Sequence, residues 1–408
     1  MANYRDIEFN IIANTMVDPG MSGGNKIFIE IAKLWASQGM KIVVFTSDVG
    51  QKICEDNGLT KATFVTWSAR KHAKRSVFYR YFIGVFAGLK NVAQNASQTS
   101  RKYKVIYASS DYWPDSLPAF KLKRLNPSAY LIGSLYLKAP NPFKGFREKS
   151  HWRFPEIFNI VFWITQWPIY RKILKKAQLV FVTSAPDRQR FIQAGRDPKD
   201  VLSIQGGVDI AAAQDFLRQG HNISDEPKKY DACFMGRLHP QKGPLELIDI
   251  WKRVTSKKPD AKLALIGHGA LESEIRDKIK RYGLQNQIEI LGFRHGQEMH
   301  KLFRASRVML HPAVYDSGGM SAWEGMAWGL PGVGFNLPAL RTYYPTGMLK
   351  AKINDFDGFA KLVLKLLTDE TLYNRISQQA ITGSQDWSWQ TRSERVFKKM
   401  QVMFQTQL

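Results

Sequence analysis

Hydrophobic and polar residues follow two recurring patterns along this chain. Short continuous apolar runs alternate with longer stretches in which apolar residues return every third or fourth position. The first pattern predicts buried strands, and the second predicts amphipathic helices. Residues 7–13 and 41–46 are expected strands, and residues 25–37 between them are an expected helix with Ile27 and Ile31 on one face. Strand–helix–strand units of this kind build parallel sheets that are covered by helices.

The alternation continues through both halves of the chain. The further expected strands are 104–109, 130–136, 179–183 and 201–204 in the first half, and 232–235, 262–266 and 288–291 in the second. The further expected helices are 185–195, 244–256, 271–282 and 297–305. With 408 residues, the chain is long for one hydrophobic core and suits two α/β domains.

Charge is the unusual part of the composition. The hydrophobic fraction of 44% and the charged fraction of 23% are ordinary for a folded soluble protein, but the net charge of +24 is not. Residues 1–205 carry 31 Lys and Arg against 14 Asp and Glu, a net of +17, and the remainder carries 28 against 21, a net of +7. The basic first half predicts an anionic partner, such as a membrane surface, nucleic acid or an acidic substrate.

The cysteines and the apolar runs predict a cytoplasmic protein that does not cross a membrane. Cys54 and Cys233 lie far apart in the sequence without metal-ligand spacing, so we expect two reduced, buried thiols. Residues 1–10 are charged and lack the apolar core of a secretory signal. The run at 157–170 has 14 residues and contains Pro168, whereas a bilayer-spanning helix needs about 20 apolar residues.

Residues 307–335 form the most informative stretch of the chain. Expected strands at its two ends enclose a loop and an expected helix; these elements are 308–311, 332–335 and 321–328. The loop holds Asp316 and the pair Gly318-Gly319 just ahead of the helix, and Glu324 lies one turn into it. Helix N-termini present unpaired N–H groups that suit an anionic ligand. Two carboxylates beside such a site suit a ligand that is both phosphorylated and rich in hydroxyls, and a nucleotide sugar is such a ligand.

A second candidate site lies at residues 236–243, with the sequence GRLHPQKG, between an expected strand and an expected helix. Arg237 offers a planar fork of hydrogen-bond donors, and Lys242 offers a compact point charge. Together these two cations are expected to neutralise a diphosphate; the alternative is a pair of surface cations at a turn.

A third candidate is the pair Gly23-Gly24, which stands where the expected helix at 25–37 begins. Glycine lets the backbone approach a ligand closely and directs N–H groups towards it. The alternative is that these glycines only serve the geometry of the turn.

These motifs resemble those of the family 4 retaining glycosyltransferases. The spacing Asp316-x7-Glu324, followed by GMAxGxP at residues 325–331, is similar to the E-x7-E signature of that family, with Asp in place of the first Glu. The stretch at 236–243 resembles the family's G-R-L-x3-K-G segment. The turn at 205–209 resembles its N-G-V-D turn, and the tail from 386 to 404 resembles its closing segment and helix.

The resemblance implies a GT-B fold, in which two Rossmann-like domains with parallel sheets face a central cleft. It places an acceptor-side domain at 1–205, a domain that binds the donor nucleotide at 206–385, and a C-terminal helix at 386–408 that returns to the first domain. It also implies a nucleotide-diphosphate sugar as donor, retention of configuration, and neither a cofactor nor a metal.

The resemblance assigns a role to each candidate residue. Arg237, Lys242 and Asp316 are the expected catalytic residues, because the cations stabilise the leaving diphosphate and Asp316 holds hydroxyls of the sugar. Glu324 is expected to hold the ribose hydroxyls. The remaining expected donor-binding residues are Gly23, Gly24, Gly236, Gly318, Gly319 and Met320. Asp111 and Tyr136 are candidates on the acceptor side, and Tyr136 stands where relatives often carry a sugar-contacting histidine.

The basic first half leaves the acceptor open between two readings. Residues 57–110 contain no Asp or Glu but ten Lys or Arg, and residues 71–89 and 140–176 combine cations with aromatic residues. These segments are amphipathic helices packed on a sheet, or they rest on an anionic membrane through residues 70–90 and 143–175.

The membrane reading predicts transfer to a lipid or lipid-linked acceptor by a peripheral enzyme on the inner membrane face. The alternative acceptor is a soluble sugar or a protein. A nucleic-acid-binding α/β protein is a distant alternative, because the sequence contains no nucleic-acid recognition motif, and we expect no specific nucleic-acid partner.

Overall fold

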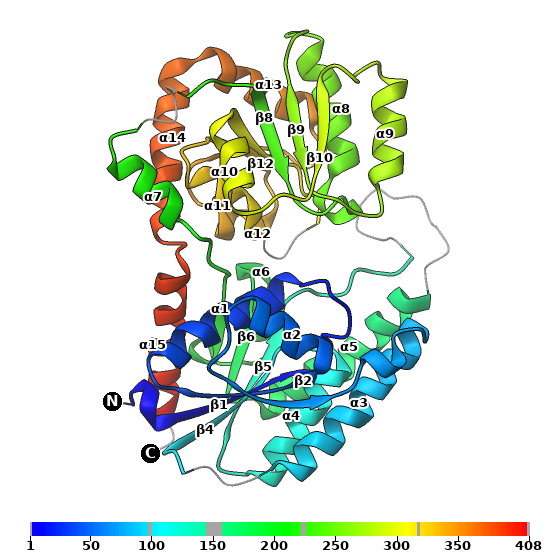
Figure 1. Ribbon diagram of the computed structural model, residues 1–408, viewed down its shortest axis with the longest axis vertical. Helices are drawn as coiled ribbons and strands as arrows, with labels where there is room; N and C mark the ends of the chain where they lie inside the picture. The colour runs from blue at the N-terminus through cyan, green and yellow to red at the C-terminus, as the bar shows by residue number, and fades with distance from the viewer. Residues whose placement is uncertain (1, 97–99, 144–156, 222–225, 316–318, 406–408) are drawn as a thin grey trace. The chain divides into compact units, whose positions relative to one another are not determined.

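The computed structural model describes residues 2–96, 100–143, 157–221, 226–315 and 319–405. The chain divides into two compact units, which Figure 1 shows together with the order of their elements. Of these described residues, those up to 206 and those from 389 onward form unit 1, and those from 207 to 388 form unit 2. The sequence placed the corresponding boundaries at 205 and 385, beside those of the structure.

Unit 1 contains a seven-stranded sheet in which all neighbouring strands run parallel, with the order β3-β2-β1-β4-β5-β6-β7. Its strands are β1 (Ile7–Ala13), β2 (Lys41–Ser47), β3 (Thr63–Trp67), β4 (Tyr103–Ala108), β5 (Tyr130–Leu135), β6 (Leu179–Val182) and β7 (Val201–Ser203). Its helices are α1 (Gly23–Ser37), α2 (Asp48–Asp56), α3 (Val77–Gln94), α4 (Trp113–Leu125), α5 (Ile157–Lys176), α6 (Ala185–Gln193) and α15 (Trp389–Gln405).

Strand residues of unit 1 point alternately into two apolar cores, one on each face of the sheet. Phe9 and Ile11 pack with α1, α2 and α15. Ile12 and Ile106 pack on the opposite face with residues from α3, α4 and α5. Because side chains alternate along a strand, a strand that is buried on both faces is apolar at nearly every position, and this explains the continuous apolar runs in the sequence.

Unit 2 contains a six-stranded parallel sheet with the order β10-β9-β8-β11-β12-β13. Its strands are β8 (Tyr230–Met235), β9 (Leu263–Ile266), β10 (Ile288–Gly292), β11 (Ser306–His311), β12 (Gly332–Phe335) and β13 (Met348–Ala351). Its helices are α7 (Ala211–Arg218), α8 (Pro244–Thr255), α9 (Glu272–Arg281), α10 (Gly296–Arg304), α11 (Ser321–Met326), α12 (Pro338–Tyr343), α13 (Phe356–Thr368) and α14 (Glu370–Gln385). Helices α8, α9 and α13 cover one face, and α10 and α11 contribute to the core on the other.

The helix expected over residues 71–89 begins later than the pattern suggested. A short 3₁₀ turn at Arg70–His72 precedes it, and α3 starts at Val77 because the Ser76 hydroxyl accepts a hydrogen bond from the N–H of Tyr79 at 3.3 Å. The helix after the Asp316 loop is shorter than expected. It ends at Met326 because the N–H groups of Trp328 and Gly329 bond three residues back, which tightens the last turn.

No helix in the described part of the chain combines the length and the apolar character that crossing a bilayer requires. Cys54 and Cys233 are both free and buried, and burial raises the pKa of each thiol to about 12.

Candidate active site

The loop between β8 and α8 lies at the carboxyl edge of the second sheet, where parallel sheets bind ligands. Its backbone lies close to the backbone of two neighbouring turns, those that follow β9 and β11, and glycines at both contacts make this possible. A Cβ added to Gly267, whose φ is +142°, would lie 1.9 Å from the carbonyl oxygen of Gly236. A Cβ added to Gly243, whose φ is +68°, would lie 2.0 Å from the carbonyl oxygen of Pro312. The loop is therefore held by backbone packing from the ends of β9 and β11.

This loop carries both cations that were expected to bind phosphate. The Arg237 side chain is exposed, and Lys242 is partly buried at the end of the 3₁₀ turn Pro240–Lys242. The carbonyl oxygen of Gln241 accepts hydrogen bonds from the N–H groups of Val314 and Tyr315 at 3.2 and 3.4 Å. These two bonds connect the cationic loop to the segment that leads from β11 towards α11.

The helix α11 holds the second carboxylate of the pair. Glu324 is partly exposed in its first turn, and Met320 stands at the N-cap position. Gly319 is buried immediately before Met320, and its carbonyl oxygen accepts a hydrogen bond from the Tyr344 hydroxyl. Asp316 and Gly318 lie outside the described residues, so their expected roles stay predictions.

Tyr344 is a residue that the sequence reasoning missed. Its fully buried hydroxyl donates to Gly319 and accepts from the N–H of Ala322 at 3.3 Å, so it fixes both sides of the start of α11. Trp323 is anchored nearby, because its indole N–H donates to the carbonyl oxygen of Tyr343 at 2.6 Å. In the sequence, the one signal of this role is the adjacent pair Tyr343 and Tyr344, and two adjacent tyrosines do not by themselves indicate a functional site.

An aromatic group at the carboxyl end of β10 was also missed. Phe293 is 62% exposed and contacts two imidazole rings, with ring centroids 6.0 Å from that of His268 and 5.8 Å from that of His295.

On α10, the ring of His300 packs against that of Trp328, with centroids 5.0 Å apart. Burial lowers the pKa of His300, although Asp209 and Glu324 oppose that shift. His300 therefore lies in the electrostatic field of the carboxylate that was expected to hold ribose.

In unit 1, the pair Gly23-Gly24 opens α1 as expected. Ser22 caps this helix, because its hydroxyl accepts a hydrogen bond from the N–H of Asn25 at 3.2 Å. A Cβ added to Gly24 would lie 3.0 Å from the ring of Tyr136, whereas one added to Gly23 would meet nothing within 4 Å. The structure thus brings together two candidates, Gly24 and Tyr136, and leaves Gly23 open.

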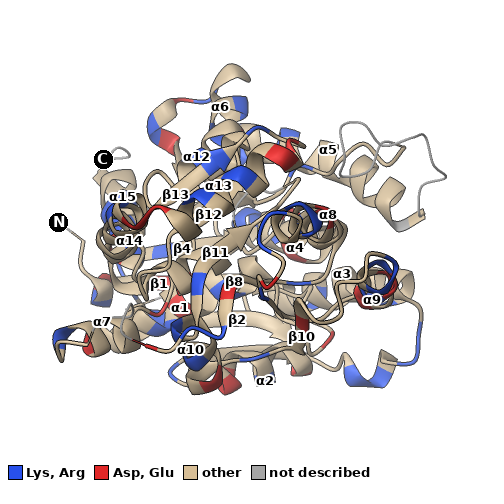
Figure 2. Cartoon of the chain, turned by 90° about the horizontal axis from the view of Figure 1, so that it is seen from above, with Lys and Arg blue, Asp and Glu red and all other residues tan. Residues whose placement is uncertain are grey.

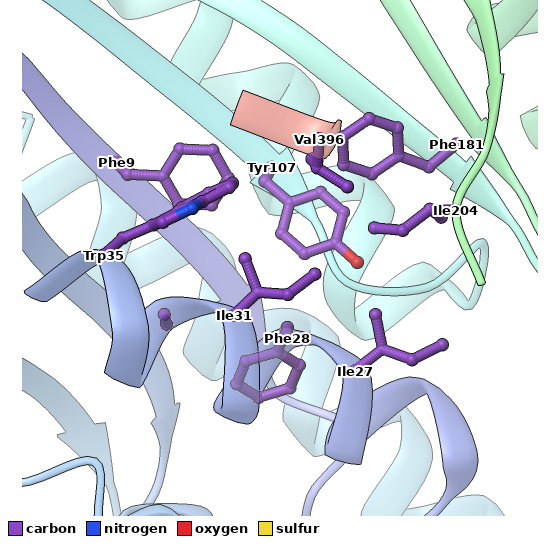
Figure 3. A pocket seen from close by; sticks show the side chains of 10 residues that line it. Phe9, Ile27, Phe28, Ile31, Trp35, Tyr107, Phe181, Ile204 and Val396 are labelled. Atoms are coloured by element: carbon purple, nitrogen blue, oxygen red, sulfur yellow. The ribbon is translucent and has the colours of Figure 1, made fainter. Parts of the chain in front are cut away.

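The Tyr136 side chain is held by a residue of the sheet, Tyr107 on β4. Its hydroxyl is hydrogen-bonded to the hydroxyl of Tyr107, and burial raises the pKa of both phenols. Tyr107 also lines a small apolar cavity of about 10 Å³ under α1 (Figure 3), together with Phe9 and Trp35. The cavity lining is hydrocarbon apart from the Tyr107 hydroxyl and the Trp35 indole N–H, so we assign the cavity to the core of unit 1.

Two buried carboxylates lie at the end of β4. Asp111 accepts a hydrogen bond from the Gln166 amide at 2.8 Å, and Asp115 accepts bonds from Thr15, Ser109 and Ser110. Burial raises the pKa of each carboxyl to about 6. Asp111 is thus buried and hydrogen-bonded, and its acceptor-side role stays a prediction; Asp115 is a further buried carboxylate nearby that the sequence reasoning did not select.

The described residues contain no group of three or more His, Cys, Asp or Glu side chains arranged to hold a metal ion.

Two family models match successive parts of the chain. The model described as Glycosyltransferase Family 4 matches residues 21–212, and the model described as Glycosyl transferases group 1 matches residues 214–382.

Curated relatives match over shorter alignments. An uncharacterized glycosyltransferase of Methanocaldococcus jannaschii is 32% identical over 163 residues, which is 39% of each chain. The GDP-mannose-dependent monoacylated alpha-(1-6)-phosphatidylinositol monomannoside mannosyltransferase of Corynebacterium glutamicum is 29% identical over 177 residues, 40% of this chain and 45% of that protein. The chain spans about half the length of the curated relatives that it matches, or less.

Solved structures match over nearly the whole chain. Anabaena HepE in complex with UDP and glucose has a TM-score of 0.69 at 17% identity, covering 97% of this chain and 99% of that one. Sucrose-phosphate synthase of Thermosynechococcus elongatus has a TM-score of 0.70 at 15% identity, covering 98% and 100%. At such low identity, these similarities concern the fold.

The two parallel-sheet units and these similarities define the class: the chain has the GT-B fold of glycosyltransferases. It belongs to the family 4 glycosyltransferases, as its two matching models together indicate.

Proposed function

We propose that this protein transfers a sugar, with retention of configuration and without a metal, from a nucleotide-diphosphate donor to a lipid or lipid-linked acceptor. The single observation that carries the donor half is the cationic loop of residues 236–243. It presents Arg237 and Lys242 at the carboxyl edge of the sheet, and it is fixed by the backbone packing of Gly243 and Gly267.

The proposed chemistry follows from charge. As the bond between sugar and diphosphate breaks, negative charge grows on the diphosphate, and cations held in place beforehand stabilise it without reorganisation. Arg237 can bind two phosphate oxygens at once, and Lys242 adds a point charge. Glu324 accepts hydrogen bonds from the ribose hydroxyls, and Asp316 accepts them from the sugar. The product should keep the anomeric configuration of the donor, which NMR of the product tests directly.

A thermal-shift screen of nucleoside diphosphates and nucleotide sugars tests the donor site. A ligand that binds only the folded protein, at a hundredfold excess over its Kd, adds about 2.7 kcal/mol of stability. We expect one nucleotide family to raise the Tm. Arg237→Ala and Lys242→Ala should each weaken that ligand by roughly tenfold or more, since hydrogen bonds to charged groups contribute about 1.5–3 kcal/mol.

The matched control is Arg276→Ala, which removes an exposed arginine of α9 that pairs with Glu272 at 2.7 Å in the same unit. A wild-type Tm that no nucleotide shifts, or equal losses in Arg276→Ala and Arg237→Ala, would contradict the proposal.

The lipid half of the proposal rests on two helices of unit 1. Their exposed apolar residues are Val77, Tyr79, Phe82 and Phe86 on α3, and Ile157, Trp163, Ile164 and Trp167 on α5. The exposed cations of the same segments are Lys71, Lys74 and Arg75 before α3, and Arg171, Lys172, Lys175 and Lys176 on α5. The whole sequence has 59 Lys and Arg against 35 Asp and Glu, and Figure 2 shows the described ones in blue and red.

Aromatic rings beside cations suit the headgroup region of an anionic bilayer. Tyr79, Phe82 and Phe86 recur at helical spacing and so form one stripe, while the opposite face of α3 packs through Gly84 and Val85. On α5, the Arg171 guanidinium lies 4.6 Å from the centre of the Trp167 ring. The Corynebacterium relative is named as a phosphatidylinositol monomannoside mannosyltransferase, which is consistent with a lipid acceptor. An anionic leaflet on the cytoplasmic side is the surface that fits this charge.

Flotation with vesicles of phosphatidylcholine and phosphatidylglycerol tests the membrane surface. We expect the wild type to float, and we expect Phe86→Ser combined with Trp167→Ser to abolish flotation. Val402→Ser, which removes an exposed apolar residue from α15, is the control. A wild type that stays in solution would favour a soluble sugar or protein acceptor.

The distant alternative, a nucleic-acid-binding protein, is tested on DNA and RNA columns. Retention of the protein that disappears at modest salt would mean nonspecific attraction.

A further inference from the structure

The helix α5 has two faces that touch different surroundings. Trp163, Ile164 and Trp167 are between 45% and 57% exposed, and they belong to the surface proposed to contact lipid. In the same two turns, Thr165 and Gln166 are buried, at 9% and 7% exposure. A single helix segment therefore carries an outward apolar surface and an inward polar one.

Both the N–H₂ group and the oxygen of the buried Gln166 amide are hydrogen-bonded. Its N–H₂ group donates to a carboxylate oxygen of Asp111 and to the carbonyl oxygen of Leu137, both at 2.8 Å. Its oxygen accepts from the N–H of Ala139 at 2.9 Å. Gln166 thus joins the loop that follows β4 to the loop that follows β5, two loops at the carboxyl edge of the first sheet.

The two residues that follow Asp111 are held by the same helix. The ring of Tyr112 stacks on that of Phe162, with centroids 4.6 Å apart and planes 19° apart. The indole N–H of Trp113 donates to the carbonyl oxygen of Thr165 at 3.2 Å. Three consecutive residues, which start α4 and include the acceptor-side candidate Asp111, are therefore fixed by contacts from one helix.

We propose that Gln166 is a positioning residue that transmits lipid contact at the outer face of α5 to Asp111, so that membrane binding orders the acceptor-side segment at residues 111–116. This inference rests on the proposed membrane surface, and it adds a link between that surface and the acceptor side. An amide with three hydrogen bonds suits this role, because a displacement of α5 moves both loops together.

The test measures hydrogen exchange of the full chain with and without vesicles of phosphatidylcholine and phosphatidylglycerol. The N–H groups of Asp115 and Ser116 both bond to the carbonyl oxygen of Tyr112, so they report whether the start of α4 is formed. We expect vesicles to slow exchange in residues 111–116 of the wild type by about tenfold. We expect Gln166→Met to float with vesicles as the wild type does but to lose that slowing.

A second variant separates positioning from simple loss of packing. Gln166→Glu keeps an oxygen for Ala139 but replaces the donor to Asp111 with a carboxyl group. At neutral pH two carboxylates then repel, and at acidic pH one of them is protonated and can donate, so vesicle-induced slowing should return only on acidification. Burial raises the pKa of Asp111, the hydrogen bond from Gln166 lowers it, and the nearby Asp115 raises it. Asp111 in turn raises the pKa values of the phenols of Tyr112 and Tyr81 that face it.

The outcomes distinguish failure of the positioning role of Gln166 from failure of the proposed membrane surface. Slowing that persists in Gln166→Met, or is absent from a wild type that floats, overturns the positioning role and leaves the membrane surface standing. Absence of flotation by the wild type overturns the membrane surface and this inference with it. Trp163→Ser should reduce flotation and slowing together, while exchange without vesicles stays at the wild-type rate.

Discussion

The carboxylate of Asp115 accepts two hydrogen bonds from one residue, Thr15: the backbone N–H donates at 3.0 Å and the hydroxyl at 2.9 Å. Thr15 follows β1, and Asp115 lies in the first turn of α4, a hundred residues away in the sequence. The hydroxyls of Ser109 and Ser110 complete the group. The buried carboxylate therefore fastens the loop that leads towards Gly23 and Gly24 to the loop that carries Asp111.

This arrangement predicts a pH dependence of stability. Burial raises the pKa of Asp115 to about 6, above its value in the unfolded chain, so the folded state binds the proton more tightly. The contribution is therefore favourable below about pH 4, and it is lost as pH rises through about 6, by about 3 kcal/mol at 1.36 kcal/mol per pKa unit. The pKa of Asp111 is also raised to about 6, so this carboxyl adds a similar contribution in the same pH window. Urea unfolding between pH 4 and pH 7 should show the combined slope, and Asp115→Asn should remove about half of it. Asp215→Asn, at an exposed carboxylate of α7, should keep the wild-type slope.

Two glycines with the same backbone conformation give a matched test of the cationic loop. Gly243 has φ +68° and Gly283 has φ +67°, but a Cβ would overlap the carbonyl oxygen of Pro312 only at Gly243. Gly283→Ala should cost about 1–2 kcal/mol, the left-handed penalty alone. Gly243→Ala should cost more and should abolish the nucleotide-induced rise in Tm. Equal Tm values for the two variants would mean that the close approach to Pro312 is unimportant.

Alanine substitutions at the two adjacent glycines of α1 should have opposite effects on stability. Alanine is the better helix former by about 1 kcal/mol, and a Cβ at Gly23 meets nothing, so Gly23→Ala should leave stability unchanged or raise it. If a ligand approaches this turn, the same variant should lower kcat/KM for the nucleotide sugar by roughly tenfold. Gly24→Ala should also destabilise the protein, because Tyr136 must move. Full turnover by Gly23→Ala would assign the pair to turn geometry.

Tyr344→Phe should lower both the stability of the protein and its affinity for the nucleotide. Loss of the hydroxyl leaves the buried carbonyl oxygen of Gly319 without that donor, at a cost of about 1–3 kcal/mol. Because the start of α11 then loosens beside Glu324, nucleotide affinity should fall as well. Tyr282→Phe is the control, since its hydroxyl bonds to Asp249 at 2.9 Å on α8. It should lower the Tm without changing nucleotide affinity.

The sequence predicted the elements whose signal is local. The strand–loop–helix order around Arg237 and Lys242 follows from an apolar run, a glycine-rich turn and an amphipathic repeat, and all three are visible in adjacent residues. The helix α4 was not predicted, because Pro114 and Pro118 indicate a loop. The helix tolerates Pro118, which has no N–H to donate to the carbonyl oxygen of Pro114, because the side-chain amide of Asn14 donates there instead, at 3.0 Å.

The missed parts of the candidate site depend on contacts between distant residues. Nothing near Gln166 in the sequence indicates Asp111, which is 55 positions away, and nothing near Tyr344 indicates Gly319. Asp316-x7-Glu324 was found because its spacing and the residues that follow it resemble a known family signature within one short stretch of sequence. Buried hydroxyls and amides follow no such spacing, and the tertiary structure alone brings them together.

The helix α15 has a consequence for how this protein is made. Its apolar residues Val396, Phe397, Met400, Met403 and Phe404 belong to the core of unit 1, and Phe404 stacks on Tyr103 at 4.3 Å. During synthesis, the residues of unit 2 therefore leave the ribosome complete while unit 1 still lacks one wall of its core. The first unit to begin translation is the last to finish folding, so a stop codon anywhere before α15 would expose apolar surface in the half of the protein that was made first.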